Sequence, residues 1–575
     1  MLNASVGWFV SFLSELKRRR VFRVAVAYVV IAFAALQGAD VLAPALRLPE
    51  WTMTLVVMLV LAGFVAAVGL AWAFDVGPGG IRRTAADDVA TAPAAGATPA
   101  TRTPALAVQL PTLAAAATPC VAVLPFLNLS RDPDNEYFAD GMTEDVIAGL
   151  SKIRTLRVIS RMSVMPFRER GHSLQHIAAT LGATTIVDGS VRRDGDRVRI
   201  VAELVDVATD AHLWAETYDR QLTDIFAIQS DVAFHIAAAL RAELSLDEQA
   251  RIRQQPTSSM EAYELYLKGR QQLSRFTQHG MERAVDYFER ALAADPSYAL
   301  AQAGIAIAYT ELSDGGMIPS DVARPRAKAA AACALRLDPG LSEAHTASGY
   351  IRSLWEFDTV GAEAEFRTAI ELSPSNADAY DFYGRLCSGL GRLDEAIALL
   401  RRAQELDPLM HRTDVANALL RAGRYDEAAL EAARAVEAEP ADARGRATLA
   451  WAYLKQGKTA KGMAELEHAV QLSPDTVQWL AQLGQARAMT GDEAGARTIL
   501  AQLEQRAAAG FVSPYHLAFI HTGLGEYDHA IHLLERAFDE GSGSVHGIGS
   551  SLLFAPLREH PRFQALVERI HPGQG

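Results

Sequence analysis

Residues 377–408, ADAYDFYGRLCSGLGRLDEAIALLRRAQELDP, contain the repeating unit on which most of this chain is built. Small residues such as Gly384 and Ala396 stand where two packed helices would approach each other most closely. Gly391 falls between two amphipathic segments, and Pro408 follows the second one. Because glycine permits a tight turn and proline cannot continue a helix, the stretch predicts a pair of short antiparallel helices.

The same unit recurs along the C-terminal half of the chain. Prolines follow amphipathic segments at similar intervals, at Pro296, Pro339, Pro374, Pro408, Pro440, Pro474 and Pro514. The unit and its period resemble the tetratricopeptide repeat (TPR), a helix pair of about 34 residues. A single pair cannot bury its apolar face, so we expect about eight units to stack into an all-α solenoid over residues 260–540. A linker and a capping helix are predicted for residues 541–575.

Two apolar segments near the start of the sequence predict a membrane anchor. Residues 51–74 carry no charge and are long enough to cross a bilayer, and another apolar run begins at Val24. We therefore predict a two-helix transmembrane hairpin over residues 24–75. Basic side chains are concentrated in residues 1–23 and at positions 82–83. By the positive-inside rule, both termini would be cytoplasmic and the protein would lie in the bacterial inner membrane with two spans.

A linker and a small α/β domain are predicted between the hairpin and the repeats. Residues 76–119 are rich in Ala, Thr and Pro and cannot supply a packed core. In residues 120–248, short apolar strands alternate with amphipathic helices, and Asp194-Gly195 is typical of a β-hairpin. Alternate residues from Val198 to Leu204 are apolar, so one face of this sheet should meet solvent.

Three segments of the α/β domain resemble one known family. They are AVLPFLNLSRDPDNEYFADGMTEDVIAGLSKI (122–153), LRVISR (156–161) and IVDGSVRRDGDRVRIVAELVDVATDAHLWAETYDRQLTDIFAIQ (186–229). In this order they are similar to the TolB-like amino-terminal domain that bacterial proteins commonly carry ahead of TPR arrays. In such relatives the domain often follows a winged-helix or a nucleotidyl cyclase domain. Here the predicted hairpin stands in that place.

The sequence shows no constellation for catalysis. Acidic residues cluster after the first strand of the α/β domain, at Asp132, Asp134, Glu136, Asp140, Glu144 and Asp145. They lack the order of a calcium loop, so we expect helix capping and solvation. Ser190 lacks a G-x-S-x-G elbow, and no phosphate-binding loop occurs. We therefore expect no enzyme activity, no catalytic residues, no metal and no cofactor. A net charge of −13 also argues against a general nucleic-acid binder.

The first helix of each TPR unit lines the concave face of such a solenoid. In units three to six, seven residues are predicted to point into this groove: Tyr350, Asp381, Arg385, Asn417, Arg421, Trp451 and Lys455. They resemble TPR grooves that clamp the carboxylate of an extended peptide with cations and amides, while aromatic side chains cover its apolar residues. The competing interpretation is that these charges only solvate the face.

The sequence thus predicts a multidomain protein with a transmembrane helical hairpin, a small α/β (TolB-like) domain and an all-α TPR solenoid. Its predicted function is an inner-membrane-anchored scaffold that binds a protein or peptide partner through the groove, with oligomer formation left open. The alternative is a signal-transducing regulator whose α/β domain senses a small ligand and relays its binding to the array. An enzyme with an unrecognised site is a third alternative.

Overall fold

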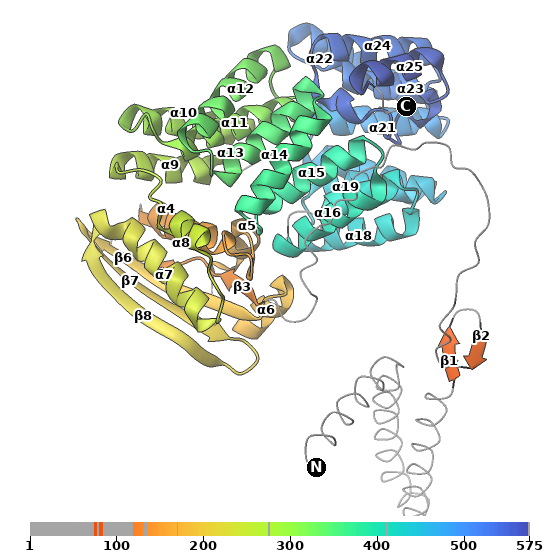
Figure 1. Ribbon diagram of the computed structural model, residues 1–575. Coiled ribbons are helices and arrows are strands. Elements are labelled where there is room, and N and C mark those ends of the chain that lie inside the picture. Colours follow the sequence, from red (N-terminus) through yellow and green to blue (C-terminus); the bar gives the residue numbers. More distant parts are fainter. Residues whose placement is uncertain are drawn as a thin grey trace, which may run out of the picture. The chain divides into compact units, whose positions relative to one another are not determined.

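The computed structural model describes residues 74–77, 80–83, 119–130, 135–169, 171–273, 277–409 and 412–572 (Figure 1). The chain divides into two units, Met1–Gln109 and Leu110–Gly575.

In the first unit, the described residues form one antiparallel strand pair. Strand β1 (Phe74–Gly77) pairs with β2 (Gly80–Arg83). The first two residues of β1 are the last two of the predicted transmembrane hairpin. The rest of that hairpin, the basic residues 1–23 and most of the predicted linker lie outside the described residues. Among the helices that the structure describes, none is both long and apolar enough to cross a bilayer.

The second unit begins with a small mixed sheet flanked by helices, which confirms the predicted α/β architecture. The sheet has the order β5-β3-β6-β7-β8, and β4 also pairs with β6. Strand β3 runs parallel to β5 and β6, whereas β6, β7 and β8 are antiparallel. The strands are β3 (Cys120–Val123), β4 (Leu127–Asn128), β5 (Arg157–Val158), β6 (Thr185–Asp194), β7 (Arg197–Asp206) and β8 (Ala211–Gln221).

The hairpin and the alternating strand form as the sequence predicts. Gly195 lies in the β6–β7 turn with a φ of 59°, a left-handed conformation that glycine adopts without strain. Four alternate residues of β7, from Val198 to Leu204, are fully buried, while Arg197 and Arg199 are exposed. The hydrophobic period of two therefore decides which face of β7 joins the core.

Helices cover this sheet and lead into the repeats. They are α4 (Glu136–Ser151), α5 (Arg161–Val164), α6 (Leu174–Leu181), α7 (Ile225–Ala239) and α8 (Leu246–Arg253). The sequence pattern predicts a helix from about Gly141 to Ser151, and α4 begins earlier, at Glu136. The amphipathic pattern from about Thr223 to Leu244 predicts one long helix, and the structure has the shorter α7 there, which ends before Leu240. A capping box of Ser245 and Glu248 then begins α8.

A solenoid of helix pairs follows, in agreement with the predicted TPR fold. The part of the chain from 260 to 539 that the structure describes contains eight pairs: α9 (Met260–Leu273) with α10 (Gln278–Ala294), α11 (Ala299–Asp314) with α12 (Ser320–Leu337), α13 (Ser342–Ile351) with α14 (Thr359–Leu372), α15 (Ala377–Gly389) with α16 (Leu393–Leu406), α17 (Arg412–Arg421) with α18 (Tyr425–Ala438), α19 (Ala443–Lys455) with α20 (Thr459–Leu472), α21 (Val477–Met489) with α22 (Glu493–Ala509), and α23 (Pro514–Gly523) with α24 (Tyr527–Asp539). Pro514 begins α23 and does not close α22 as the sequence suggested, since α22 ends at Ala509.

Small residues let the two helices of a pair approach each other. A Cβ added at Gly384 would lie 2.6 Å from Leu400, and one at Gly349 would lie 2.8 Å from Phe366, so larger residues would separate the helices. Gly391, between α15 and α16, has a φ of 76°, which a side chain would strain. The signals that predicted the repeat thus correspond to steric requirements of its turn and its contact.

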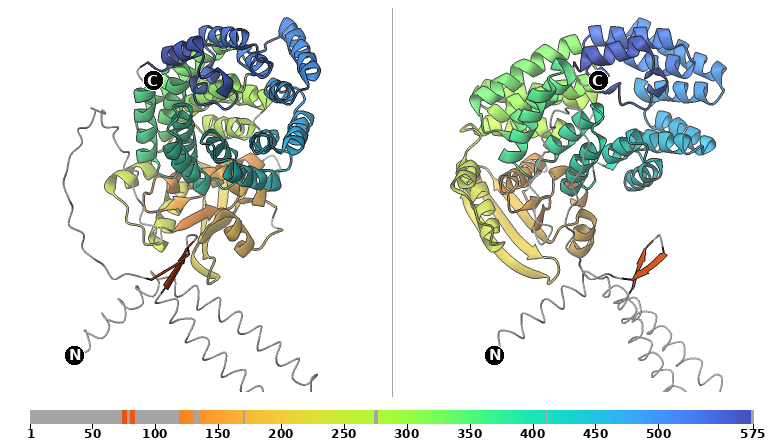
Figure 2. Two further views of the ribbon diagram at one scale, coloured as in Figure 1. Left: turned by 90° about the vertical axis from the view of Figure 1, so that its right-hand side faces the viewer. Right: turned by 45° about the vertical axis from the view of Figure 1, so that its right-hand side comes forward.

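The array curves so that its last pair returns toward earlier ones (Figure 2). The ring of Phe357, after the short helix η4 (Arg352–Glu356), lies 5.5 Å from the ring of Phe538 in α24. Beyond α24, residues Gly543–Gly547 form the short helix η5, Ala555–Leu557 form η6, and Pro561–Ile570 form α25. Val545 and Ile548 are buried, so residues 541–550 are packed and are not the loose connector that their glycines and serines suggested.

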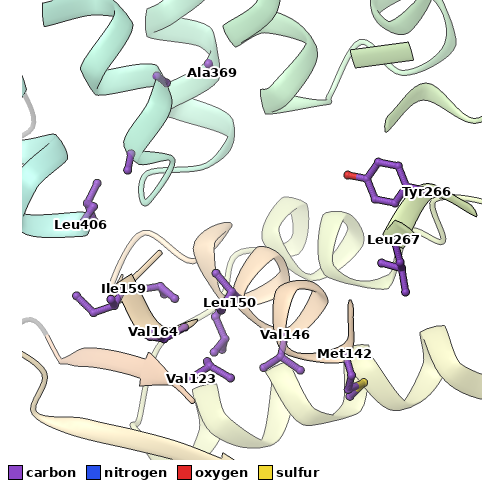
Figure 3. Close-up of a cluster of buried hydrophobic side chains, with 14 of the residues drawn as sticks. Val123, Met142, Val146, Leu150, Ile159, Val164, Tyr266, Leu267, Ala369 and Leu406 are labelled. Atoms are coloured by element: carbon purple, nitrogen blue, oxygen red, sulfur yellow. The ribbon is translucent and has the colours of Figure 1, made fainter. Parts of the chain in front are cut away.

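The α/β domain rests on the array through α4 and α5 (Figure 3). Met142, Val146 and Leu150 of α4 belong to one apolar core with Leu267 of α9 and Leu406 of α16. The edge of the array supplies polar contacts. Both hydroxyls of Ser160 and Ser163 donate to the buried carboxylate of Asp407, and the Ser160 amide donates to the Leu406 carbonyl over 2.8 Å. The two parts therefore share a continuous interface.

Replacing Asp407 with alanine should weaken this interface. The change leaves the buried hydroxyl of Ser163 and the part-buried hydroxyl of Ser160 without their acceptor, which should lower the free energy of unfolding by about 2 kcal/mol. Urea denaturation followed by circular dichroism measures this value. The matched control is Glu405→Ala, which removes an exposed carboxylate two residues earlier, in the last turn of α16, and should cost less than about 1 kcal/mol. Equal losses in both variants would show that Asp407 does not hold the interface.

Candidate functional site

The candidate site is the inner face of the array, formed by the first helix of each pair. The seven residues predicted to line it lie on α13, α15, α17 and α19. The structure places three of them in one cluster, one against the C-terminal segment, and three along the following helices. That they bind a partner stays a prediction.

Tyr350, Asp381 and Arg385 form a cluster around a residue that the sequence did not indicate, Asp314 at the end of α11. One guanidinium nitrogen of Arg385 donates to Asp314 Oδ2 over 2.6 Å, and the Tyr350 hydroxyl donates to the same oxygen over 2.7 Å. The Arg385 guanidinium also lies over the rings of Tyr350 and Phe382, at 5.3 and 5.5 Å from their centres. Arg385 is therefore already paired within the chain.

The neighbourhood of Arg385 is acidic. Burial alone would raise the pKa of Asp314, but Arg385 and the Tyr350 hydroxyl lower it below its ordinary value. Glu311, one turn earlier on α11, makes no side-chain hydrogen bond or ion pair with the residues that the structure describes. Its burial, together with Asp314, Asp378 and Asp381, outweighs Arg385 and raises its pKa to about 7. This end of the inner face is therefore acidic. Near neutral pH, a proton bound to Glu311 offsets part of its negative charge.

Arg421, at the end of α17, contacts the chain's own C-terminal segment. Its guanidinium donates to the carbonyl of Gly547 over 3.1 Å and to the hydroxyl of Ser550 over 2.5 Å. The Ser550 hydroxyl in turn donates to the Ser388 carbonyl at the end of α15 over 2.7 Å. Gly389 allows this approach, because a Cβ there would lie 2.8 Å from the ring of His546. Residues 543–550 therefore lie directly on the inner face.

The remaining three predicted residues follow along the array. The Asn417 side-chain oxygen accepts from the Thr448 hydroxyl over 3.3 Å, and the Trp451 indole donates to Gln482 over 2.8 Å. Trp451 is buried, so it packs between repeats and offers little surface to a partner. Lys455 is half-buried at the end of α19. It makes no hydrogen bond or ion pair with the described residues.

Sequence reasoning missed Asp314 and the docked segment. Asp314 stands in the second unit, where an insertion between the helices hides the repeat register. Ser550 belongs to a glycine- and serine-rich stretch whose composition is typical of a linker. No local signal identifies either residue, because both acquire their role through contacts with helices far away in the sequence.

A second candidate site is a cavity of about 650 Å³ between the α/β domain and the first four repeats. Helix α4 lines one side, and the starts of α11, α13 and α15 line the other. The Lys152 ammonium donates to the Arg251 carbonyl over 2.9 Å, and burial lowers its pKa. Arg251 Nε is buried without a hydrogen-bond partner. Neither cation has a carboxylate within 4.0 Å among the described residues.

The acidic residues of α4 are engaged at this junction and are not simply solvated caps. Glu144 pairs with Arg270 of α9 and lies 3.5 Å from Arg161. Asp145 accepts from the Tyr263 hydroxyl and, over 2.8 Å, from Gln229. Burial raises the pKa of Asp145 to about 7, although both hydrogen bonds lower it. The described residues contain no group of three potential metal ligands.

Comparison with known proteins identifies the repeats. A family model described as tetratricopeptide repeat matches residues 356–418 and 419–481. This chain therefore carries TPR repeats, and such repeats generally mediate protein–protein interaction. The solved structures that resemble it include the TPR protein YrrB, described as having an unusual peptide-binding site (23% identity, TM-score 0.24, 34% of this chain and 95% of that one), and PilF of Pseudomonas aeruginosa (18% identity, TM-score 0.29, 40% and 98%). At such low TM-scores, neither of these two structures indicates a function for this chain.

Two curated relatives match shorter parts of the chain. A Rhizobium meliloti (strain 1021) protein provisionally named adenylate cyclase 3 is 41% identical over 191 residues, or 33% of this chain and 32% of that protein. The transcriptional regulator HilA of Salmonella typhimurium is 26% identical over 151 residues, covering 26% of this chain and 27% of HilA. The chain thus spans about a third or less of each relative, and their activities do not transfer to it.

The raised pKa of Glu311 makes stability depend on pH. The folded state holds this proton more tightly than the unfolded chain, whose glutamate pKa is about 4.3. The stabilisation that protonated Glu311 gives to the folded state is therefore complete below about pH 4.3, the unfolded-state pKa, and is lost as the pH rises through 7. Between pH 5 and pH 8, wild type should lose about 2 kcal/mol relative to Glu311→Gln, which stays neutral. Urea denaturation at each pH measures the difference, with Glu405→Gln as the exposed control. A constant difference across this range would contradict the assignment.

Proposed function

We propose that this protein is a scaffold that binds a protein partner on the inner face of its TPR array. The proposal includes the anchor: residues 24–75 would hold the protein in the bacterial inner membrane, with residues 120–575 in the cytoplasm. It also includes the TolB-like assignment of residues 120–248. The scaffold would bring its partner to the membrane surface without catalysing a reaction.

The contact between Arg421 and residues 547–550 supports the inner face as the binding surface. There a segment of chain lies across the ends of α15 and α17 and is bound by its carbonyl and hydroxyl oxygens. Main-chain and small polar groups are available in any extended peptide, so a partner segment could use the same donors.

Photo-crosslinking from defined positions tests which face binds. A benzophenone amino acid at Asn417 or Lys455, on inner helices, should crosslink a partner protein in cells. The same residue at Glu437 or Gln471, exposed on the outer helices α18 and α20, should not. Circular dichroism shows whether each variant keeps its helices. Crosslinks from the outer positions alone would reject the inner face as the binding surface.

A second function, a regulator that senses a small ligand, is favoured by the cavity at the domain junction. A ligand there would touch α4 and the starts of three inner helices at once, so its binding could reach the array directly. Lys152 and Arg251, which have no carboxylate within 4.0 Å among the described residues, would suit an anionic group of a ligand, although Asp338 and Glu343 also line the cavity. The name of the Rhizobium relative belongs to a signalling protein and adds only weak support.

Calorimetry with ATP, cyclic AMP and citrate as anionic probes tests this second function. At least one probe should bind wild type, and Lys152→Met should weaken that binding by about tenfold or more because a charged hydrogen bond is lost. The control Lys461→Met removes an exposed charge from α20 and should bind as wild type does. Binding that is equal in Lys152→Met and wild type would place the ligand elsewhere.

A further inference from the structure

Strand β8 forms one edge of the sheet in the α/β domain. It pairs with β7 on its inner side, and no other strand that the structure describes pairs with it. Figure 1 shows β8 at the outer margin of the sheet. We propose that β8 pairs with the β8 strand of a second copy of this chain, so that two sheets join into one across a dimer. This inference goes beyond the proposed scaffold function and uses a different surface.

β8 lacks most of the features by which edge strands avoid association. The outer backbone N–H and C=O groups of an edge can pair with another strand, and proteins usually prevent this with short strands, proline, lysine or bulges. β8 spans Ala211–Gln221 and contains no proline or lysine. A register shift, opposite Leu204 and Val205, lies near its beginning. From Trp214 to Gln221 the strand is regular and mostly exposed, so this part can accept a second strand.

The charges of β8 are complementary to themselves in one register. Two identical antiparallel strands pair about a two-fold axis, and the residue on this axis decides which side chains lie opposite each other. An axis at Tyr218 places Glu216 opposite Arg220 of the second copy, and symmetry makes this charge pair occur twice. Axes at Glu216, Asp219 or Arg220 would oppose two like charges, which destabilises a sheet. In the regular part of the strand, only the axis at Tyr218 opposes unlike charges.

Glu216 and Arg220 lie on one face of the sheet but cannot pair within one copy. Together with Tyr218 they stand opposite three residues of β7 that are fully buried: Ala202, Val198 and Ile200. Two residues that are four positions apart on a strand are separated by about 13 Å, which is too far for an ion pair. The Arg220 side chain makes no hydrogen bond or ion pair with the residues that the structure describes. A second copy would supply the acid that Arg220 lacks.

Contacts around Glu216 hold its carboxylate in place at the edge. The Tyr218 hydroxyl donates to it over 3.3 Å and lies 3.2 Å from Nδ1 of His235 on α7. The ring of Trp214 stacks on the ring of His235, with 5.7 Å between the centres. A side chain that is ordered before association loses less conformational entropy on binding. Tryptophan, tyrosine and arginine are also the residues that most often dominate the energetics of protein interfaces, and this edge carries all three.

The mass of the full chain in detergent, measured by light scattering, tests the pairing. Wild type at about 50 µM should have twice the mass of one chain. Glu216→Arg and Arg220→Glu should each be monomeric, because each opposes like charges at two places. The double variant Glu216→Arg/Arg220→Glu exchanges the two charges and should dimerise again. Glu437→Arg, the same charge change at an exposed site on the outer helix α18, is the matched control and should stay dimeric.

Mixing the two single variants tests the register itself. In the mixture, one copy carries two arginines and the other carries two glutamates, so a dimer should form although neither variant dimerises alone. Circular dichroism shows that each variant is folded.

The competing interpretation is that the charges of β8 protect this edge and keep the chain monomeric. A monomeric wild type would support that interpretation and reject the pairing. Single variants that stay dimeric would place the contact between copies on another surface. A mixture of folded single variants that stays monomeric would reject the register centred on Tyr218.

Discussion

The packing of α4 against α9 is the contact on which the rest of the structure depends. Gly141 of α4 lies so close to Leu267 of α9 that a Cβ at this position would overlap the leucine side chain. The first helix pair of a solenoid exposes an apolar face that no earlier repeat covers. Here α4 covers it, and the Tyr263 hydroxyl of α9 donates to Asp145 at the same seam. The α/β domain therefore acts as the N-terminal cap of the array.

The same arrangement places the inner face. With the first repeats fixed by α4 and the edge of the fourth fixed by Asp407, the curve of the array brings its last pair back toward the third. The C-terminal segment then reaches the ends of α15 and α17, where Arg421 binds it. Two surfaces result: a cavity at the junction of the domains and an inner face on which the C-terminal segment lies. Both proposed functions use features that arise only when cap and repeats are assembled.

The sequence predicted the parts of this fold that depend on local sterics. Gly391 and Gly384 marked the turn and the contact of a repeat, and both meet steric requirements in the structure. The period of two in β7 predicted its buried face. For the candidate site, periodicity selected positions that lie on the first helices of their pairs, and their role in binding stays a prediction.

Periodicity could not reveal what those side chains touch. Asp314, which pairs with Arg385, and Ser550, which meets Arg421, lie far away in the sequence. Nor could it show that Trp451 would be buried between repeats. The docking of α4 on α9 was missed for the same reason: its acids suggested capping, and only the assembled structure shows their partners on another helix.

Hydrogen exchange of the full chain in increasing urea tests the central claim, that the α/β domain is the cap of the array. If α4 covers α9, peptides from α4 and from α9 should lose protection at the same urea concentration, because neither helix keeps its buried face without the other. Peptides from β6 should follow α4. Loss of protection in α4 and β6 while α9 and α10 stay protected would contradict the claim, since the first repeat would then be stable uncovered.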